Sequence, residues 1–145
     1  MLQRIQTIFL LLAAVCSGLI FYFPFATSES VQSSAILSDG VYDFNDNIAI
    51  PILFGLGALL SLGALVSFKS RKNQSMLGRI ALIANLIGMI LVAVFFLTDG
   101  ANMGSVVPED GVGAYLPAGA MVLLGFALHF IKKDDKLVSS MDRLR

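Results

Sequence analysis

Charged residues and cysteine are scarce in this sequence, and each shortage excludes a class of protein. Lys, Arg, Asp and Glu make up 14% of the 145 residues, well below the roughly 25% of soluble globular domains. Cys16 is the only cysteine, so the chain can form neither an intrachain disulfide nor a cysteine-based metal site. Ten basic residues balance ten acidic ones, so no net charge attracts the chain to nucleic acid.

Apolar residues are abundant instead. They account for 57% of the chain, and the mean hydropathy is +0.82. A chain of 145 residues has too high a surface-to-volume ratio to bury that much apolar surface in water. The composition therefore excludes a soluble enzyme, a disordered chain and a nucleic-acid binder, and it indicates a membrane protein.

The apolar residues are gathered in four long stretches that carry almost no charge. Each stretch is close to the roughly 20 residues that an α-helix needs to cross a bilayer. Backbone polar groups within lipid must be paired inside their own segment, so these stretches must be helical. We therefore predict an all-α integral membrane protein, a single-domain antiparallel bundle with transmembrane helices over about residues 7–26, 48–68, 77–98 and 112–132 and a tail over 133–145.

Charges alternate between the segments that connect these helices. All ten basic residues lie in the N-terminal segment, the second connection with the start of the third helix, or the C-terminal tail. The first and third connections carry only acidic residues. Because basic residues accumulate on the cytoplasmic side, we predict that both termini are cytoplasmic. A cleaved signal peptide is the alternative for the first stretch, since Arg4, an apolar run and the small residues 26–28 follow in order.

Turn and cap residues add local detail. Pro51 lies in the expected first turn of the second helix, where its missing N–H costs nothing. Ser75 is the expected N-cap of the third helix. Asp39 and Gly40 separate two short apolar runs, residues 35–37 and 41–42, and this pattern predicts a small β-hairpin in the first outer connection.

Two polar residues within the apolar stretches are candidate functional residues. Asn85 is expected to hydrogen-bond a neighbouring helix, with a substrate contact as the alternative. His129, the only histidine, is expected near the lipid headgroups; a haem, metal or proton-relay ligand is its alternative role. No Asp, Glu, Lys or Arg lies deep in any stretch, which disfavours a proton-driven multidrug pump of the small four-helix type.

The remaining patterns concern packing and partners. Small residues recur four apart, which lets helices approach closely within one bundle or within a homo-oligomer; the pairs are 14 with 18, 57 with 61, 84 with 88, and 114 with 118. In the tail, Leu137, Met141 and Leu144 share one helical face. They are expected to contact the membrane surface or a partner protein. The chain lacks the spacings of catalytic triads, phosphate-binding loops and zinc sites, so we expect no catalytic residue, cofactor or metal.

Both ends of the chain resemble a known family. The opening MLQRIQTIFLLLA and the closing SMDRLR are similar to those of small four-helix inner-membrane proteins of Bacteroidota, catalogued only as a domain of unknown function. The resemblance covers essentially the whole chain, and it implies a bacterial inner membrane and four helices. It implies no activity, ligand or catalytic residue.

Three functions are compatible with these patterns. We expect a non-enzymatic accessory or assembly subunit that binds other subunits of a larger membrane complex, because the chain is small and its spans carry no charge. A small permease or channel, built as an oligomer, is the first alternative. A membrane enzyme or redox subunit is the second.

Overall fold

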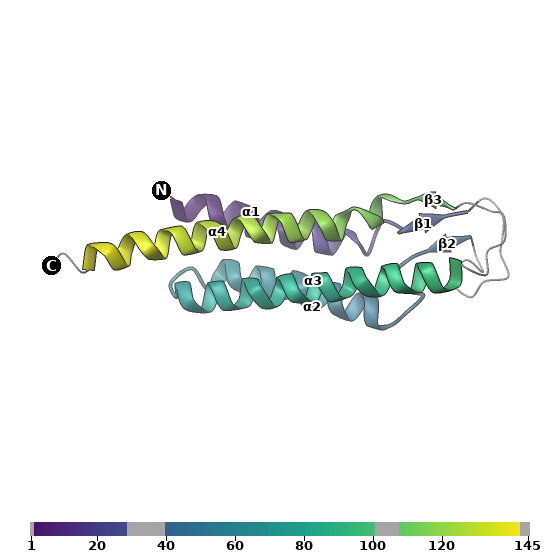
Figure 1. Ribbon diagram of the computed structural model, residues 1–145, viewed down its shortest axis with the longest axis horizontal. Helices are drawn as coiled ribbons and strands as arrows, with labels where there is room; N and C mark the ends of the chain where they lie inside the picture. Colours follow the sequence, from purple (N-terminus) through teal and green to yellow (C-terminus); the bar gives the residue numbers. More distant parts are fainter. Residues whose placement is uncertain (1, 29–39, 101–107, 143–145) are drawn as a thin grey trace.

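Over residues 2–28, 40–100 and 108–142, which the computed structural model describes, the protein forms four α-helices that lie side by side and a small sheet at one end (Figure 1). Side chains are described for residues 5–28, 40–98 and 108–140. The helices are α1 (Leu2–Leu19), α2 (Ala49–Val66), α3 (Arg71–Gly100) and α4 (Leu116–Asp142). The short elements are strands β1 (Ala26–Thr27), β2 (Val41–Tyr42) and β3 (Glu109–Asp110) and the 3₁₀-helix η1 (Val112–Ala114).

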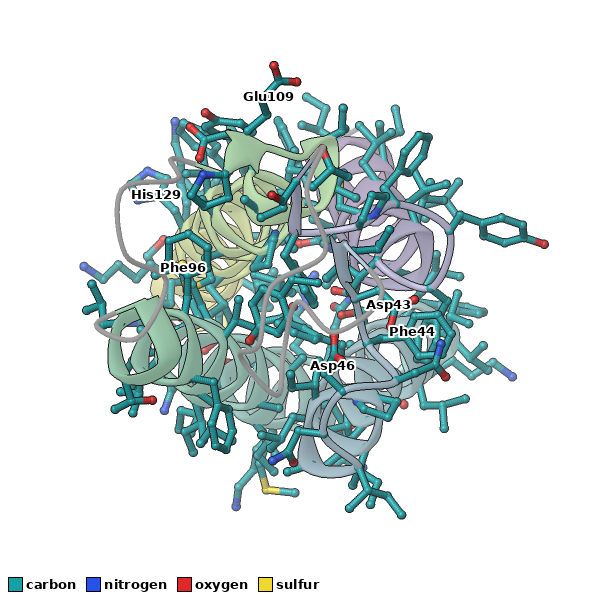
Figure 2. The ribbon with its side chains drawn as sticks, turned by 90° about the vertical axis from the view of Figure 1, so that its right-hand side faces the viewer. Asp43, Phe44, Asp46, Phe96, Glu109 and His129 are labelled. Carbon is teal, nitrogen blue, oxygen red and sulfur yellow. The ribbon has the colours of Figure 1, made fainter. Side chains whose placement is uncertain are left out.

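The helices form a closed square in which each packs against its neighbours in the chain and α1 also packs against α4 (Figure 2). The start of α1, the α2–α3 connection and the end of α4 lie at one end of the bundle (Figure 1). We call this end the basic end and the opposite one the sheet end. Aromatic rings join α1 to α4, where Phe9 stacks on Phe130 with ring centroids 5.6 Å apart. The predicted four-helix bundle is confirmed.

Large apolar side chains point outward from this bundle. Leu59 of α2 is 68% exposed and Leu97 of α3 is 72% exposed. The inner faces instead carry many small or polar residues, including the fully buried Ser61 and Asn85. By length and composition three helical segments are able to cross a membrane, namely Ala49–Val66, Arg71–Thr98 and Val112–Ser140. The described apolar part of α1, Ile5–Leu19, is shorter.

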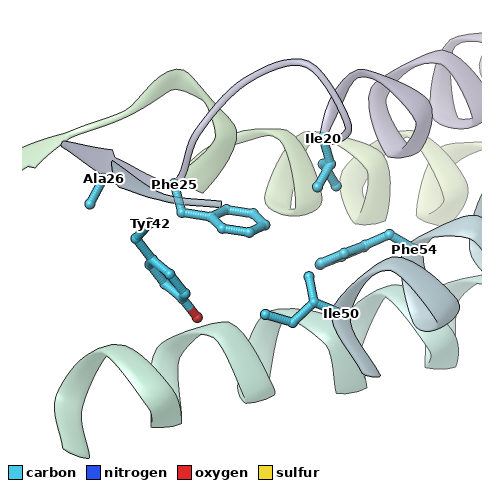
Figure 3. Packing of buried hydrophobic residues seen from close by; sticks show 6 residues of the cluster. All are labelled: Ile20, Phe25, Ala26, Tyr42, Ile50 and Phe54. Atoms are coloured by element: carbon cyan, nitrogen blue, oxygen red, sulfur yellow. The ribbon is translucent and has the colours of Figure 1, made fainter. Parts of the chain in front are cut away.

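The strands join the first and third connections into one antiparallel sheet of order β2-β1-β3. Ala26 pairs with Tyr42 on one side and with Asp110 on the other. Below the sheet, Phe25 and Tyr42 pack on Ile50 and Phe54 of α2 (Figure 3). The sheet therefore closes the end of the bundle over a buried aromatic cluster.

The structure describes one strand of the predicted hairpin. Val41 and Tyr42 form a strand, and Gly40 before it has a positive φ of +80°. The described partner of that strand is Ala26–Thr27, whereas the predicted partner, residues 35–37, lies outside the described residues. A sequence pattern detects neighbouring strands more readily than distant ones.

Several helix boundaries differ from those predicted. The first helix ends at Leu19 instead of continuing to Ala26. Pro24 has no N–H to continue the helical hydrogen bonds and disfavours helical conformation in Phe23, so the helix has to end before that residue. Phe21 and Tyr22 close the helix through tight backbone bonds to Gly18 and Leu19. The fourth helix begins at Leu116 and continues without a break to Asp142, so the predicted tail starts as part of α4.

The cap of the third helix was assigned to the wrong serine. Ser70, rather than Ser75, precedes α3, and its hydroxyl accepts a hydrogen bond of 3.5 Å from the backbone N–H of Asn73. Asn73 is the third helical residue, the usual donor to an N-cap side chain. Ser75 instead lies inside the helix, because the charged residues before it are also good helix formers. Pro51 does lie in the first turn of α2, as predicted.

Candidate functional site

A polar contact lies in the middle of the bundle. Ser17 of α1 donates a hydrogen bond of 2.9 Å from its hydroxyl to the amide oxygen of Asn85 on α3. The amide nitrogen of Asn85 donates in turn to the backbone oxygen of Ala81, also at 2.9 Å. Both side chains are fully buried. Asn85 thus makes an interhelical hydrogen bond of the kind that its position in an apolar helix predicts.

Glycines make room for this contact. A Cβ atom on Gly57 of α2 would overlap the amide nitrogen of Asn85. Four residues later, the buried Ser61 donates from its hydroxyl to the backbone oxygen of Gly57 at 2.8 Å. On α3, a Cβ on Gly88 would lie 2.9 Å from the ring of Phe54. Gly57 of α2 therefore accommodates Asn85 of α3, and Gly88 of α3 accommodates Phe54 of α2. The two glycines let these helices pack closely.

Two buried glutamines lie nearer the basic end. Gln74 of α3 is fully buried and Gln6 of α1 is 3% exposed. Neither amide atom of Gln74, nor the amide oxygen of Gln6, has a hydrogen-bond partner among the described residues. Neither glutamine is among the residues predicted from the sequence, although for Gln74 a signal is present: it precedes Ala81 by seven residues and Asn85 by eleven, which places all three on one helical face.

His129 lies away from this polar interior. Its side chain is exposed on the outer side of α4 (Figure 2). Its ring meets that of Phe130 edge-on, with centroids 5.8 Å apart. Among the described residues, no group of three or more His, Cys, Asp or Glu side chains is placed to hold a metal ion. Because His129 is exposed on the outer side of α4 whereas Asn85 is fully buried, the structure does not bring these two residues together.

At the basic end an ion pair joins α3 to α4. The Arg71 guanidinium lies 3.3 Å from the carboxylate of Asp134, and its side chain also donates to the backbone oxygen of Asp134 at 3.2 Å. The two side chains are 25% and 14% exposed. No local sequence pattern predicts this pair, because 63 residues separate its members.

Beyond the ion pair, α4 extends past the other helices (Figure 1). Leu137 is 47% exposed and Val138 is 41% exposed on this extension. The side chains of Met141 and Leu144, the other predicted contact residues, lie outside the described residues. Leu137 is therefore the one residue of the predicted apolar face whose side chain the structure describes.

The outward apolar side chains, the polar interior and the three membrane-compatible helices define the class: a helical bundle compatible with a membrane. Residues 2–144 match the family described as "Domain of unknown function (DUF4293)", and the chain belongs to that family, as its two ends predicted. Neither the curated proteins nor the solved structures contain a match to the chain.

Proposed function

We propose that this chain is a multi-pass protein of the bacterial inner membrane that serves as a non-enzymatic accessory or assembly subunit of a larger membrane complex. The observation that carries the proposal is the α4 extension, which leaves the bundle as a continuous helix with Leu137 and Val138 about half exposed. A helix that served only to cross the membrane would need no exposed apolar side chains beyond the bundle. An apolar pair beyond the bundle favours contact with another protein.

The outer surface supports placement of all four helices in the membrane. The exposed residues of α1, α2, α3 and α4 include Ile8, Ile52, Ile90 and Val122, each more than half exposed. Apolar patches this extensive are rare on soluble monomers. The apolar part of α1, Ile5–Leu19, is about 22 Å long at 1.5 Å per residue, and the apolar residues 20–26 that follow it bring the segment close to the hydrocarbon thickness of roughly 30 Å. We therefore include α1 as the fourth span.

The charge distribution supports an orientation with both termini in the cytoplasm. The described basic residues, which include Lys69, Lys72 and Lys136, come from the start of α1, the α2–α3 connection, the first turns of α3 and the last turns of α4. Asp43, Asp46 and Glu109 lie at the sheet end (Figure 2). Because positive residues are retained in the cytoplasm, the basic end is the cytoplasmic end, and the sheet faces the periplasm.

Recovery of partners tests the proposed function. The full chain is purified from its native membrane in mild detergent, and co-eluting proteins are identified by mass spectrometry. Leu137→Ser/Val138→Ser removes the exposed apolar pair, whereas Ser139→Ala/Ser140→Ala alters two exposed neighbours on the same turn. We expect the first variant to lose its partner and the second to retain it, at equal levels in the membrane. A chain that is monomeric and alone in both detergent and nanodiscs would contradict the proposal.

The buried glutamines favour one other function, an oligomeric permease or channel. Both amide atoms of Gln74 and the amide oxygen of Gln6 are buried without a hydrogen-bond partner among the described residues, and such atoms are costly to bury unless water or a solute reaches them. Flux through reconstituted liposomes distinguishes the two functions. Solute or ion flux that Gln74→Leu abolishes would favour the permease, and no flux at all would favour the accessory subunit.

A further inference from the structure

A groove of about 490 Å³ lies at the basic end, between the first turns of α3 and the later part of α4. Lys72 and Arg79 line it from α3, and Lys132 lines it from α4. Arg71 also reaches the groove, and Asp135 is its one carboxylate. The groove is therefore strongly basic, although the whole chain has no net charge.

Most of this positive charge is not neutralised by the protein. Arg71 is engaged by Asp134, whereas no ion pair among the described residues involves Lys72, Arg79 or Lys132. These three side chains are exposed at the groove. Like charges held around one concave site raise the local potential and attract an anion.

The groove is also continuous with apolar surface. Met76, which lines it, is 55% exposed, and Ile131 at its floor is 2% exposed. One turn beyond Met76 on α3, Ile80 is 41% exposed, and Ile83 follows at 52%. A free anion would use only the basic side chains, whereas an amphiphile would use both surfaces.

We propose that this groove binds an anionic phospholipid, with the headgroup phosphates between Lys72, Arg79 and Lys132 and the acyl chains along the exposed apolar side of α3. Arg79 would hold a phosphate oxygen through its planar guanidinium, and the two lysines would supply point charges. Basic pockets between membrane helices on the cytoplasmic side recognise such headgroups. The inference rests on the proposed placement of the chain in a membrane.

Lipid counting by native mass spectrometry tests this site. The full chain is delipidated in mild detergent and mixed in turn with cardiolipin, phosphatidylglycerol and phosphatidylcholine. We expect retention of the two anionic lipids, because Lys72, Arg79 and Lys132 line the groove against a single carboxylate, and little retention of the zwitterionic lipid. Equal retention of all three lipids would overturn the proposal.

A pair of double variants separates the groove from general surface charge. Lys72→Gln/Lys132→Gln removes two cations that line it, and Lys133→Gln/Lys136→Gln removes two exposed cations of α4 that do not. We expect the first to weaken cardiolipin binding about tenfold or more and the second to change it little. Lys72→Arg/Lys132→Arg keeps the charge and should bind normally. Equal losses in the two glutamine variants would overturn the site.

Inorganic phosphate distinguishes a lipid from a free anion. We expect millimolar phosphate neither to displace cardiolipin nor to raise the melting temperature of the delipidated chain. Displacement by phosphate would overturn the assignment to a lipid. The lipid site and the proposed function can fail separately. If the chain recovers a partner protein but retains no anionic lipid, only the lipid site is overturned. If it retains anionic lipid but recovers no partner protein, only the accessory role is overturned.

Discussion

Ser17 and Asn85 form a 2.9 Å hydrogen bond across the diagonal of the bundle, where both side chains are inaccessible. Their helices, α1 and α3, are not neighbours in the square of packed helices. The contact therefore connects the two halves of the bundle, α1 with α4 and α2 with α3. Gly57 of α2 accommodates the same amide, so α1, α2 and α3 meet at this point.

A double-mutant cycle on Ser17→Ala and Asn85→Ala should reveal coupling between these residues. Hydrogen bonds between membrane helices contribute about 0.6 kcal/mol on average and up to about 1.7 kcal/mol. We expect a coupling energy within that range, because both partners are fully buried. Equilibrium unfolding in mixed micelles measures it. Strictly additive losses would mean that the bond does not contribute to stability.

Gly57→Ala should destabilise the bundle even though alanine is the better helix former. The new Cβ would overlap the amide of Asn85, and such overpacking costs about 1–3 kcal/mol. Gly125→Ala on α4 is the matched control, because nothing lies within 4 Å of its added Cβ. The control should be neutral or stabilising by up to about 1 kcal/mol. Thermal unfolding in detergent compares them, and equal melting temperatures would contradict the close approach of α2 and α3.

Arg71→Ala should release the last turns of α4. The variant leaves the Asp134 carboxylate, 14% exposed, without its cation, at a cost of about 1 kcal/mol. Lys69→Ala removes one charge at the same end from an exposed residue and should have less effect. Hydrogen exchange in residues 134–142 provides the measurement, and faster exchange is expected only for Arg71→Ala. The swap Arg71→Asp/Asp134→Arg should restore protection.

Tyr42→Phe should loosen the contact between the sheet and α3. The Tyr42 hydroxyl donates to the backbone oxygen of Val92 at 3.1 Å, and the residue is 1% exposed. Loss of a single hydrogen bond of this kind costs about 0.5–1.5 kcal/mol. Tyr22→Phe is the control, since Tyr22 is 85% exposed. If both variants unfold at the same temperature as the parent chain, the hydroxyl of Tyr42 does not anchor the sheet.

The number and type of the helices could be predicted because long uncharged stretches of this length allow few other structures. The end of α1 could not be read from apolarity alone, since residues 21–25 are equally apolar inside or outside a helix. Pro24 was the available signal, because its effect on Phe23 requires the helix to end before that residue, but it does not place the end at Leu19. Likewise, the continuity of α4 through Lys132 and Asp135 was hidden by the change from apolar to charged composition.

The candidate sites were less predictable because their residues meet only in space. Asn85 could be singled out for its polarity, but its partner Ser17 is 68 residues away. The same holds for the groove, whose cations come from α3 and α4. Ala26 of β1 pairs with Asp110 of β3, far along the chain, and no local pattern identifies such a partner.

Cysteine labelling across the membrane tests the central claim, that the basic end is cytoplasmic and the sheet end periplasmic. In a Cys16→Ser background, Glu109→Cys reports on the exposed sheet end and Asn73→Cys on the exposed basic end. Cells with a permeabilised outer membrane are treated with a membrane-impermeant thiol reagent before and after lysis. We predict that Glu109→Cys labels in intact cells and that Asn73→Cys labels only after lysis. Labelling of Asn73→Cys in intact cells would contradict the account.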